Sequence, residues 1–372
     1  MRRISAEQEQ RKLPDFTIFF TVLILTAIGL VMVFSASYIT ALESRGDAFY
    51  FLRRQAFWAC LGLIGMVFTA NFNYKKWHRM APVLLFLNFI FLLLVFIPGL
   101  GEEYGGARRW ISMGGLFTIQ PAEFTKLVLV IFTASFLSKK NIDMDDFWRS
   151  SFVPLLMMAI SFLLIIKQPD LGTAVTLALA VGVIVFAAGM PFKQLFCLAS
   201  FSLPAMLYFS MSEEYRMERI FSFLDPWADP LDTGYHIIQS LYALGPGGLF
   251  GVGLGRSRQK LYYLPEPQND FIFSIIGEEL GFLGAVTIML LFFVLIWRGF
   301  KTSLMAPDTF SSLLAMGITV MVAVQTLLNI GVVTGSIPVT GITLPLISAG
   351  GSSLFFTMCG LGIIMNISRY NR

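Results

Sequence analysis

Long runs of apolar residues, separated by short polar segments, occupy most of the chain. An α-helix rises about 1.5 Å per residue and the hydrocarbon core of a bilayer is about 30 Å thick, so runs of this length predict helices that cross a membrane. About ten are predicted, at Phe16–Tyr38, Phe51–Ala70, Ala81–Pro98, Pro121–Leu137, Phe152–Ile166, Leu171–Gly189, Gln194–Ser210, Asp270–Trp297, Phe310–Val333 and Ile342–Ile367. The pattern predicts an all-α integral membrane protein, a single polytopic domain over residues 1–372, with a large extracytoplasmic loop at about 211–269 between the seventh and eighth spans.

Composition agrees with membrane insertion. Of the 372 residues, 56% are hydrophobic and 13% are charged, which is typical of membrane proteins and not of soluble domains. Cys60, Cys197 and Cys359 each lie in an apolar run without metal-ligand spacing, so we expect buried thiols and not disulfides. The first run lacks an obvious small-residue cleavage site and is predicted to be a retained anchor.

Lysine and arginine residues collect on one side of the predicted spans. They lie in the head (Arg2, Arg3, Arg11, Lys12), at residues 75–79, 138–140 and 298–301, and in the tail at 368–372. By the positive-inside rule that side is cytoplasmic, which predicts a plasma-membrane protein with both termini in the cytoplasm. Four arginines on the opposite side weaken the bias: Arg53, Arg54, Arg108 and Arg109. The loop at 211–269 is then external, and its segments 213–227 and 234–245 have the periodicity of amphipathic helices.

Asp270 lies where a proline-containing polar segment meets the eighth apolar run. A carboxylate at such a boundary faces water on one side and hydrocarbon on the other, so it can meet a substrate that is half lipid and half polar. Asp is also a favoured helix N-cap, and capping is the alternative role. On a helix, Asp270 would share a face with small residues that leave room for a neighbouring helix or an acyl chain, namely Ser274, Gly277, Gly281 and Gly284.

Two further pairs of charged residues lie inside apolar runs, where charges are unfavourable and usually face a partner or a cavity. Glu123 and Lys126 are spaced to form an ion pair on one helix face, and mutual neutralisation is the alternative to contact with a ligand. Glu278 and Glu279 lie about two turns beyond Asp270. They either belong to the site or pair with basic residues for structure alone.

Polar residues near the outer boundary are weaker candidates. Arg108 and Arg109 stand beside Trp110, a combination that fits an interfacial anchor better than a phosphate site. Asp170 fits a turn or a helix cap as well as it fits a binding site.

The external loop adds four side chains that can contact a substrate. Arg216 and Arg219, spaced i, i+3, suit a pyrophosphate or a carboxylate, although a solvated helix face is the simpler explanation. Gln239 and Glu266 are two further polar candidates in the same loop.

Two motifs do not support a site. The glycine-rich stretch 245–255 follows no strand and lacks a GK[ST] signature, so it predicts a flexible loop and no nucleotide site. His78 and His236 are too few and too far apart for a metal cluster or a Ser/His relay. A carboxylate is therefore the acid–base candidate.

Five long strings of this chain resemble a known family. They are PDLGT (169–173), FLDPWADP (223–230), the segment 234–281 with its PEPQNDFIF, NIGVVTGSIPVTGITLPLISAGGSS (329–353) and NISRY (366–370). These strings are similar to the SEDS (shape, elongation, division and sporulation) peptidoglycan polymerases, over essentially the whole chain, and closer to the FtsW and SpoVE branch than to RodA. Ala349 stands where the family pattern has a tyrosine.

The resemblance implies an enzyme that polymerises lipid II on the outer face of the plasma membrane and releases undecaprenyl pyrophosphate. Asp270 matches the family's essential aspartate and would be the general base on the acceptor 4-hydroxyl, while Glu123 and Lys126 match a pair at the family's cavity. Lys126, Arg216, Arg219 or a divalent cation such as Mg²⁺ or Mn²⁺ would stabilise the pyrophosphate; no cofactor is certain, and no metal-ligating residue is predicted.

A class B penicillin-binding protein, which is a transpeptidase, is implied as the partner, with other division or sporulation proteins, membrane lipid and no nucleic acid. The division septum is the expected location. Two other functions remain open. A lipid II flippase would need charged sites near the midplane, where only Glu278 and Glu279 approach, and a non-catalytic scaffold would recruit the transpeptidase alone.

Overall fold

The computed structural model describes residues 12–104, 107–113, 117–139, 143–211, 213–261 and 263–371. Arg2, Arg3, Arg11, Lys140 and Arg372, which contribute to the predicted orientation, lie outside the described residues. The helices are α1 (Phe16–Arg45), α2 (Tyr50–Asn71), α3 (Tyr74–Leu94), α4 (Pro121–Leu137), α5 (Phe147–Ser150), α6 (Phe152–Ile166), α7 (Leu171–Ala187), α8 (Phe192–Met211), α9 (Glu214–Leu224), α10 (Tyr235–Leu244), α11 (Ile272–Leu304), α12 (Thr309–Val333) and α13 (Gly351–Ser368). Strands β1 (Gly101–Tyr104), β2 (Ala107–Met113) and β3 (Phe117–Ile119) and the 3₁₀ turns η1 (Pro226–Ala228) and η2 (Gly245–Gly247) complete the described structure.

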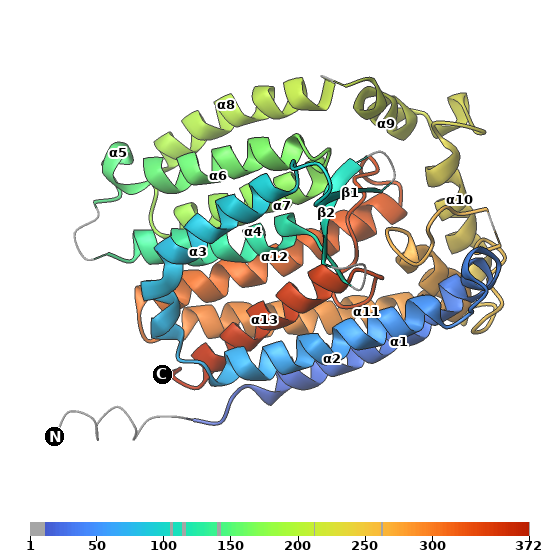
Figure 1. Cartoon of the computed structure of the whole chain (residues 1–372), viewed down its shortest axis with the longest axis horizontal. Coiled ribbons are helices and arrows are strands. Elements are labelled where there is room, and N and C mark those ends of the chain that lie inside the picture. The colour runs from blue at the N-terminus through green and yellow to red at the C-terminus, as the bar shows by residue number, and fades with distance from the viewer. Residues whose placement is uncertain are drawn as a thin grey trace.

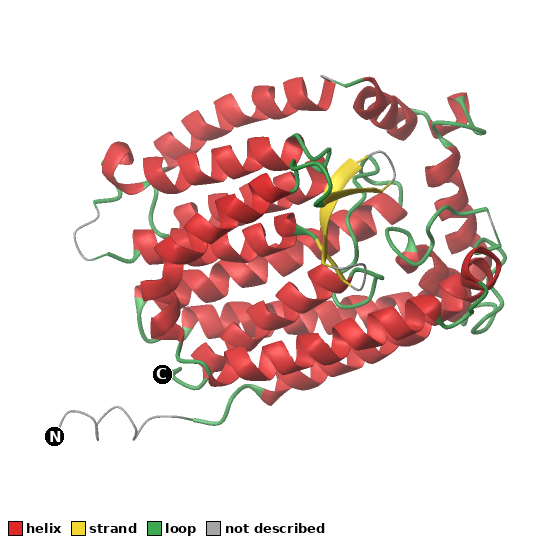
Figure 2. Cartoon of the chain, in the orientation of Figure 1, coloured by secondary structure: helices red, strands yellow, loops and turns green. Residues whose placement is uncertain are grey.

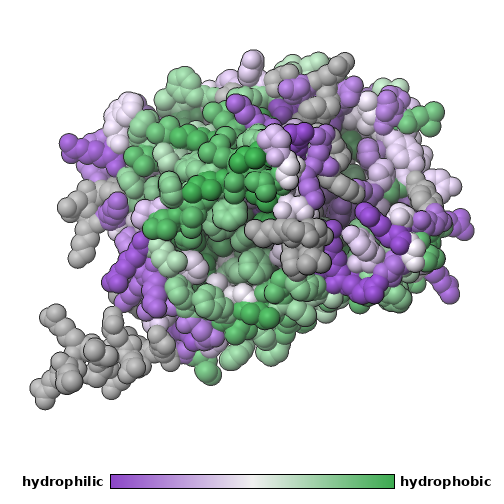
Figure 3. Space-filling model, in the orientation of Figure 1, coloured by the Kyte–Doolittle hydropathy of each residue, from purple (hydrophilic) through white to green (hydrophobic). Residues whose placement is uncertain are grey.

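The long helices run side by side in one bundle, with both ends of the described chain at one end and α9, α10 and the small sheet towards the other (Figure 1 and Figure 2). α2 packs along α13, α11 along α12, and α3 along α4. Apolar side chains gather over the middle of the visible face, and polar ones gather at its two ends (Figure 3). Such a belt is what a bilayer requires of a spanning bundle.

A helix stands at each of the ten predicted places, and the predicted bounds of α4 and α6 coincide with the observed ones. In the described chain six helices are long and apolar enough to cross a membrane, namely α1, α2, α3, α11, α12 and α13, and α6 and α7 are shorter apolar helices. The protein is a multi-pass membrane protein, and the number of ten spans stays a prediction. The loop helices α9 and α10 confirm the periodicity of segments 213–227 and 234–245.

Three short antiparallel strands between α3 and α4 are not predicted by the sequence pattern. They are ordered β1–β2–β3, with Glu102 opposite Trp110 and Ile111 opposite Ile119. Strands of three to seven residues next to glycines carry too few alternations to stand out from the surrounding loops. The fold is all-α as predicted apart from this small sheet, whose strand β2 contributes Arg109 and Trp110 to the cavity described below.

The last predicted span begins too early. Residues 342–350 are apolar, but they form a loop, and α13 begins only at Gly351. Side chains bind the loop's backbone groups: Asn329 donates to Ile342 O at 2.7 Å, and the Ser348 hydroxyl accepts from Leu344 N at 2.8 Å. Non-helical backbone at membrane depth is tolerated where protein groups satisfy it in this way.

α11 differs from the predicted continuous helix in two respects. It begins at Ile272, so Asp270 precedes it, and its N-cap is Phe271 without a side-chain cap; the capping role considered for Asp270 is therefore wrong. It also breaks at Gly281, whose φ is 68°, so the small-residue face predicted from Asp270 to Gly284 is not continuous. Ser274 and Gly277 pack against Ser240 and Leu244 of α10 and not against an open groove.

The glycine-rich stretch 245–255 repairs this break. Val252 N and Gly253 N donate to the carbonyls of Glu278 and Glu279, at 2.9 and 3.1 Å, and Phe282 N and Leu283 N donate to Gly248 O and Leu249 O. These are the backbone groups that would bond to one another in an unbroken helix. The prediction of a flexible loop is wrong, because the glycines allow close packing on α11.

Candidate functional site

A cavity of about 170 Å³ lies at the end of the bundle opposite the termini. Its walls come from β2, α4, α7, α12, α13 and the loops before α11 and α13. The lining residues are Arg109, Trp110, Gln120, Glu123, Asp170, Thr173, Glu266, Asn269, Asp270, Gln325, Gly341, Ile342, Thr343, Ala349, Gly350 and Ser353. Charged and amide side chains dominate this set, so the cavity suits a polar ligand.

Asp270 lines the cavity from the turn that precedes α11. The amide of Asn329 on α12 donates to Asp270 O at 2.8 Å and fixes the backbone, and Gly341, with φ 70°, brings a second loop close to the carboxylate. Burial raises the pKa of Asp270, and the nearby Glu266 carboxylate raises it as well. The Arg219 and Arg109 guanidiniums lower it, and the net result is a rise from 3.8 to about 6. The group is thus a carboxylate tuned towards neutral pH.

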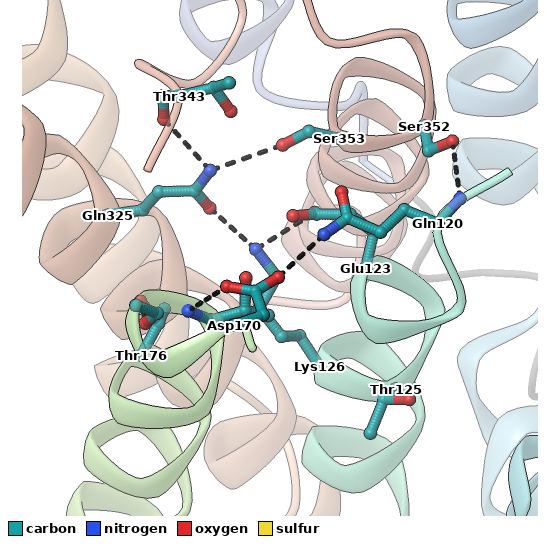
Figure 4. A network of polar contacts seen from close by, with 12 residues as sticks. Gln120, Glu123, Thr125, Lys126, Asp170, Thr176, Gln325, Thr343, Ser352 and Ser353 are labelled. Atoms are coloured by element: carbon teal, nitrogen blue, oxygen red, sulfur yellow. Dashed lines mark hydrogen bonds and ion pairs between the residues drawn. The ribbon is translucent and has the colours of Figure 1, made fainter. Parts of the chain in front are cut away.

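Glu123 and Lys126 form the ion pair that their spacing predicts, with 2.9 Å between Lys126 Nζ and Glu123 Oε2. Both side chains are buried, with 2% of the lysine and 7% of the glutamate exposed. The ammonium also donates to Gln325 Oε1 of α12 at 2.9 Å, and the Gln325 amide donates to Thr343 O and to Ser353 Oγ (Figure 4). One network therefore joins α4, α12 and α13 beneath the cavity.

Asp170 and Arg109 hold a second wall of the cavity. Asp170 caps α7 by accepting from Thr173 N at 3.1 Å, as its turn position predicts, and it also accepts from the Gln120 amide at 2.8 Å (Figure 4). Arg109 donates from β2 to Gln168 O at 3.1 Å and to Pro169 O. Its guanidinium therefore lies against the loop that carries Asp170.

The other predicted residues are less central. Arg108 is exposed and pairs with Glu103 at 3.2 Å, outside the cavity lining, so it is Arg109 that faces inward. Arg216 is buried and donates to Phe209 O, so the solvated helix face considered for it is wrong. Arg219 donates to Val339 O from α9. Gln239 is half-buried on α10 and is not among the lining residues, whereas Glu266 is.

Glu278 and Glu279 face away from this cavity and hold the loop after α10. Lys260 Nζ lies 2.7 Å from Glu279 Oε1, and the Ser35 hydroxyl of α1 donates to Glu279 Oε2 at 2.6 Å. Glu278 accepts from the Ser257 hydroxyl and from Arg258 N. Pairing with a basic residue, the structural alternative considered for these two carboxylates, is observed for Glu279, whereas Glu278 is held by a hydroxyl and a backbone N–H.

Sequence reasoning overlooked Gln325 and Asn329, which organise the cavity from α12. Both are amide side chains inside an apolar run, and a buried amide is unfavourable unless it is hydrogen-bonded. That signal was available. Arg109 and Arg108 are adjacent, and nothing in the sequence separates the two, because the pairing of β2 with β1 decides which of them points inward.

No group of three His, Cys, Asp or Glu side chains in the described ranges could hold a metal ion. Asp170, Glu266 and Asp270 nevertheless line one cavity, and oxygen ligands of this kind suit Mg²⁺ or Mn²⁺. These carboxylates could therefore hold a divalent cation only if phosphate oxygens of a bound ligand completed its shell.

Comparisons with known proteins cover nearly the whole chain. The family described as "Cell cycle protein", of FtsW, RodA and SpoVE, matches residues 15–372. The chain is 49% identical over 360 residues to stage V sporulation protein E of Bacillus subtilis (strain 168), covering 96% of this chain and 98% of that protein. It is 43% identical over 357 residues to a probable peptidoglycan glycosyltransferase FtsW of Trichlorobacter lovleyi, covering 95% and 93% of the two chains.

Solved structures share the same fold. A chain from a peptidoglycan synthase complex, described as coordinating polymerization and crosslinking, superposes with a TM-score of 0.78 at 31% identity and covers 96% of this chain and 98% of that one. The rod shape determining protein RodA of Thermus thermophilus superposes with a TM-score of 0.71 at 29% identity, covering 96% and 97%.

Proposed function

This chain belongs to the FtsW, RodA and SpoVE family and is a peptidoglycan glycosyltransferase, and we propose that it polymerises lipid II with Asp270 as the general base. One observation carries the proposal: the partly buried Asp270 carboxyl group, with a pKa near 6, lines a polar cavity at the boundary of the apolar belt. Arg109 lines the same cavity, as do Glu123 and Gln325, the two side chains that bind Lys126. Such a site can receive a sugar whose lipid anchor stays in the membrane.

The proposed reaction moves one proton and exchanges one bond. The acceptor sugar's 4-hydroxyl oxygen bonds to C1 of the donor sugar, the bond from C1 to the pyrophosphate breaks, and the hydroxyl proton passes to Asp270. With a pKa of about 6, Asp270 is ionised in about nine of ten molecules at pH 7 and is a stronger base than an ordinary aspartate. Arg109, which lines the cavity, supplies positive charge for the departing undecaprenyl pyrophosphate. Lys126 lies beneath the lining, paired with Glu123, and adds to the positive potential from there.

Several further features belong to the same proposal. We expect a class B penicillin-binding protein as partner, since a structural relative is part of a peptidoglycan synthase complex. Lipid II and the partner would be met on the outer side, with both termini in the cytoplasm and the protein at the division septum. Mg²⁺ or Mn²⁺ would help to neutralise the pyrophosphate, and no step above depends on it.

The test is polymerisation of purified lipid II by protein in detergent or vesicles. Asp270→Asn should lower the rate by about 10² to 10⁴-fold, which is the contribution of a positioned base. Asp232→Asn is the matched control, because Asp232 is an exposed aspartate of the same loop, outside the cavity lining. Folding of both variants is checked by thermal unfolding.

Full polymerisation by a folded Asp270→Asn protein would remove Asp270 from the role of base. Protein-dependent movement of lipid II across vesicles without polymer would favour the flippase. Binding of the partner transpeptidase, with neither polymer formed nor lipid II moved by this protein, would favour the scaffold.

A further inference from the structure

A second cavity, of about 540 Å³, opens between the end of α10 and α11. Its lining consists of Tyr242, Pro246, Val252, Arg256, Arg258, Gln259 and Glu278. None of these residues lines the cavity that holds Asp270. The proposed glycosyl transfer therefore leaves this second cavity without a role.

The second cavity offers unused positive charge. Arg256 and Arg258 are exposed, and within the described ranges neither guanidinium forms an ion pair or a hydrogen bond. The Glu278 carboxylate of the same cavity accepts from neutral donors, the Ser257 hydroxyl and Arg258 N, the latter at 2.8 Å. It therefore offsets one of the two arginine charges and leaves the lining with one net positive charge. Two planar guanidiniums beside one cavity suit the oxygens of a phosphate group.

The cavity also offers an acceptor without a donor. The side-chain oxygen Oε1 of Gln259 is buried, and it has no hydrogen-bond partner in the described structure. A buried polar atom in this state is destabilising unless a ligand or water donates to it. A ligand that fits would thus combine a phosphate with a hydroxyl or ammonium donor.

The rim of the cavity lies at the edge of the apolar surface. Leu249 and Phe250 of the adjoining loop are 61% and 79% exposed, and Phe282 and Leu283 of α11 are 59% and 49% exposed. The bonds from Phe282 N to Gly248 O and from Leu283 N to Leu249 O hold these two apolar segments together. Large exposed apolar side chains on a loop next to a membrane helix favour contact with acyl chains. The arginines then lie at the depth of lipid headgroups.

We propose that the second cavity binds the headgroup of an anionic bilayer phospholipid, such as phosphatidylglycerol. Its phosphodiester would lie between Arg256 and Arg258, a headgroup hydroxyl would donate to Gln259 Oε1, and its acyl chains would lie along Leu249, Phe250 and Phe282. Bound lipid would hold the glycine loop against α11. The chain continues from this loop through Lys260 to Asp270.

The test measures lipid retained by the full-length purified protein in native mass spectrometry, with phosphatidylglycerol, phosphatidylcholine and undecaprenyl pyrophosphate added separately. The wild-type protein should retain one phosphatidylglycerol in preference to phosphatidylcholine. Arg256→Gln with Arg258→Gln should weaken that binding by about 25-fold, at about fivefold per arginine. Gln259→Met should weaken the binding of phosphatidylglycerol, and it should leave the binding of a lipid with a methyl phosphodiester headgroup unchanged.

The matched control is Arg45→Gln with Arg53→Gln, which removes two exposed arginines from the same end of the bundle and away from the cavity. If both double variants weaken phosphatidylglycerol binding equally, general surface charge explains the effect and the proposed site is refuted. Displacement of phosphatidylglycerol by undecaprenyl pyrophosphate would assign the cavity to the substrate and also overturn it. If the glutamine variant does not fold, Arg256→Lys with Arg258→Lys keeps the charge and should lose binding in part through the missing guanidinium geometry.

Discussion

The reactivity of the site depends on how one carboxylate is surrounded. Asp270 combines burial with the charges of one carboxylate, Glu266, and two guanidiniums, Arg219 and Arg109, and the balance raises its pKa to about 6. Burial alone disfavours the charged form, whereas the arginines favour it, so the pKa stops short of the range in which the group would be neutral at pH 7. A base is most effective when its pKa is near the working pH.

The pH dependence of polymerisation should report this pKa. Since the proposed base is the ionised form of Asp270, kcat/KM should fall below a pH of about 6, by about tenfold for each further pH unit. Glu266→Gln removes a negative neighbour, which lowers the pKa of Asp270 and moves the fall to lower pH. Glu218→Gln, an exposed change in the same loop, should leave the profile in place. A shift to higher pH with Glu266→Gln would contradict the assignment.

The buried ion pair can be tested by removing one or both of its charges. Lys126→Met leaves the Glu123 carboxylate buried without its counter-ion, and breaking such a pair typically lowers the free energy of unfolding by about 3 to 5 kcal/mol. Adding Glu123→Gln should restore most of the thermal stability, because no unpaired charge remains. Polymerisation should stay low in both proteins, since the cation is missing. Recovery of activity in the double variant would show that the pair serves structure alone.

At the scale of elements, apolar runs predicted the positions of the helices correctly. The prediction failed where side chains of another helix bind the backbone groups of an apolar run. Runs such as Pro121–Leu137 have no alternative but a helix, because a membrane offers no other partners for the backbone. Residues 342–350 look equally apolar, yet Gln325 and Asn329 bind the carbonyls of Thr343 and Ile342 and keep the segment as a loop. Hydropathy cannot distinguish the two cases, because the deciding partners lie on another helix.

The break in α11 gives a prediction at this scale. A Cβ at Gly251 would lie 2.2 Å from Glu279 O, and Gly251 has a φ of 80°, so Gly251→Ala should separate the loop from the helix. The strain should lower the free energy of unfolding by at least about 1 to 3 kcal/mol. Gly182→Ala on α7 meets nothing within 4 Å and should change the melting temperature little. Equal melting temperatures for the two variants would argue against tight packing at Gly251.

At the scale of the molecule, the site exists only because the bundle brings distant segments together. Arg109, Asp170, Asp270 and Gln325 come from four different elements or loops and line one cavity. Asp270, Glu123 and Lys126 could be selected from the sequence, since charge at an apolar boundary or inside a span is informative. Their grouping with Gln325 could not, because packing of α4 against α12 decides it.

The arrangement across the membrane yields a final prediction. Ser44 lies near the end of α1 and Lys301 near the end of α11, both exposed, and the antiparallel course of the two helices puts them at opposite ends of the bundle (Figure 1). In a protein whose three cysteines are replaced by alanine, Ser44→Cys should react with a membrane-impermeant maleimide in intact cells, and Lys301→Cys should react only after the membrane is opened. Ser44 shares its end with Asp270, so this pattern would put the cavity on the outer side, where lipid-linked sugars for cell-wall growth must be joined. The reverse pattern would place Asp270 in the cytoplasm and contradict the proposed reaction.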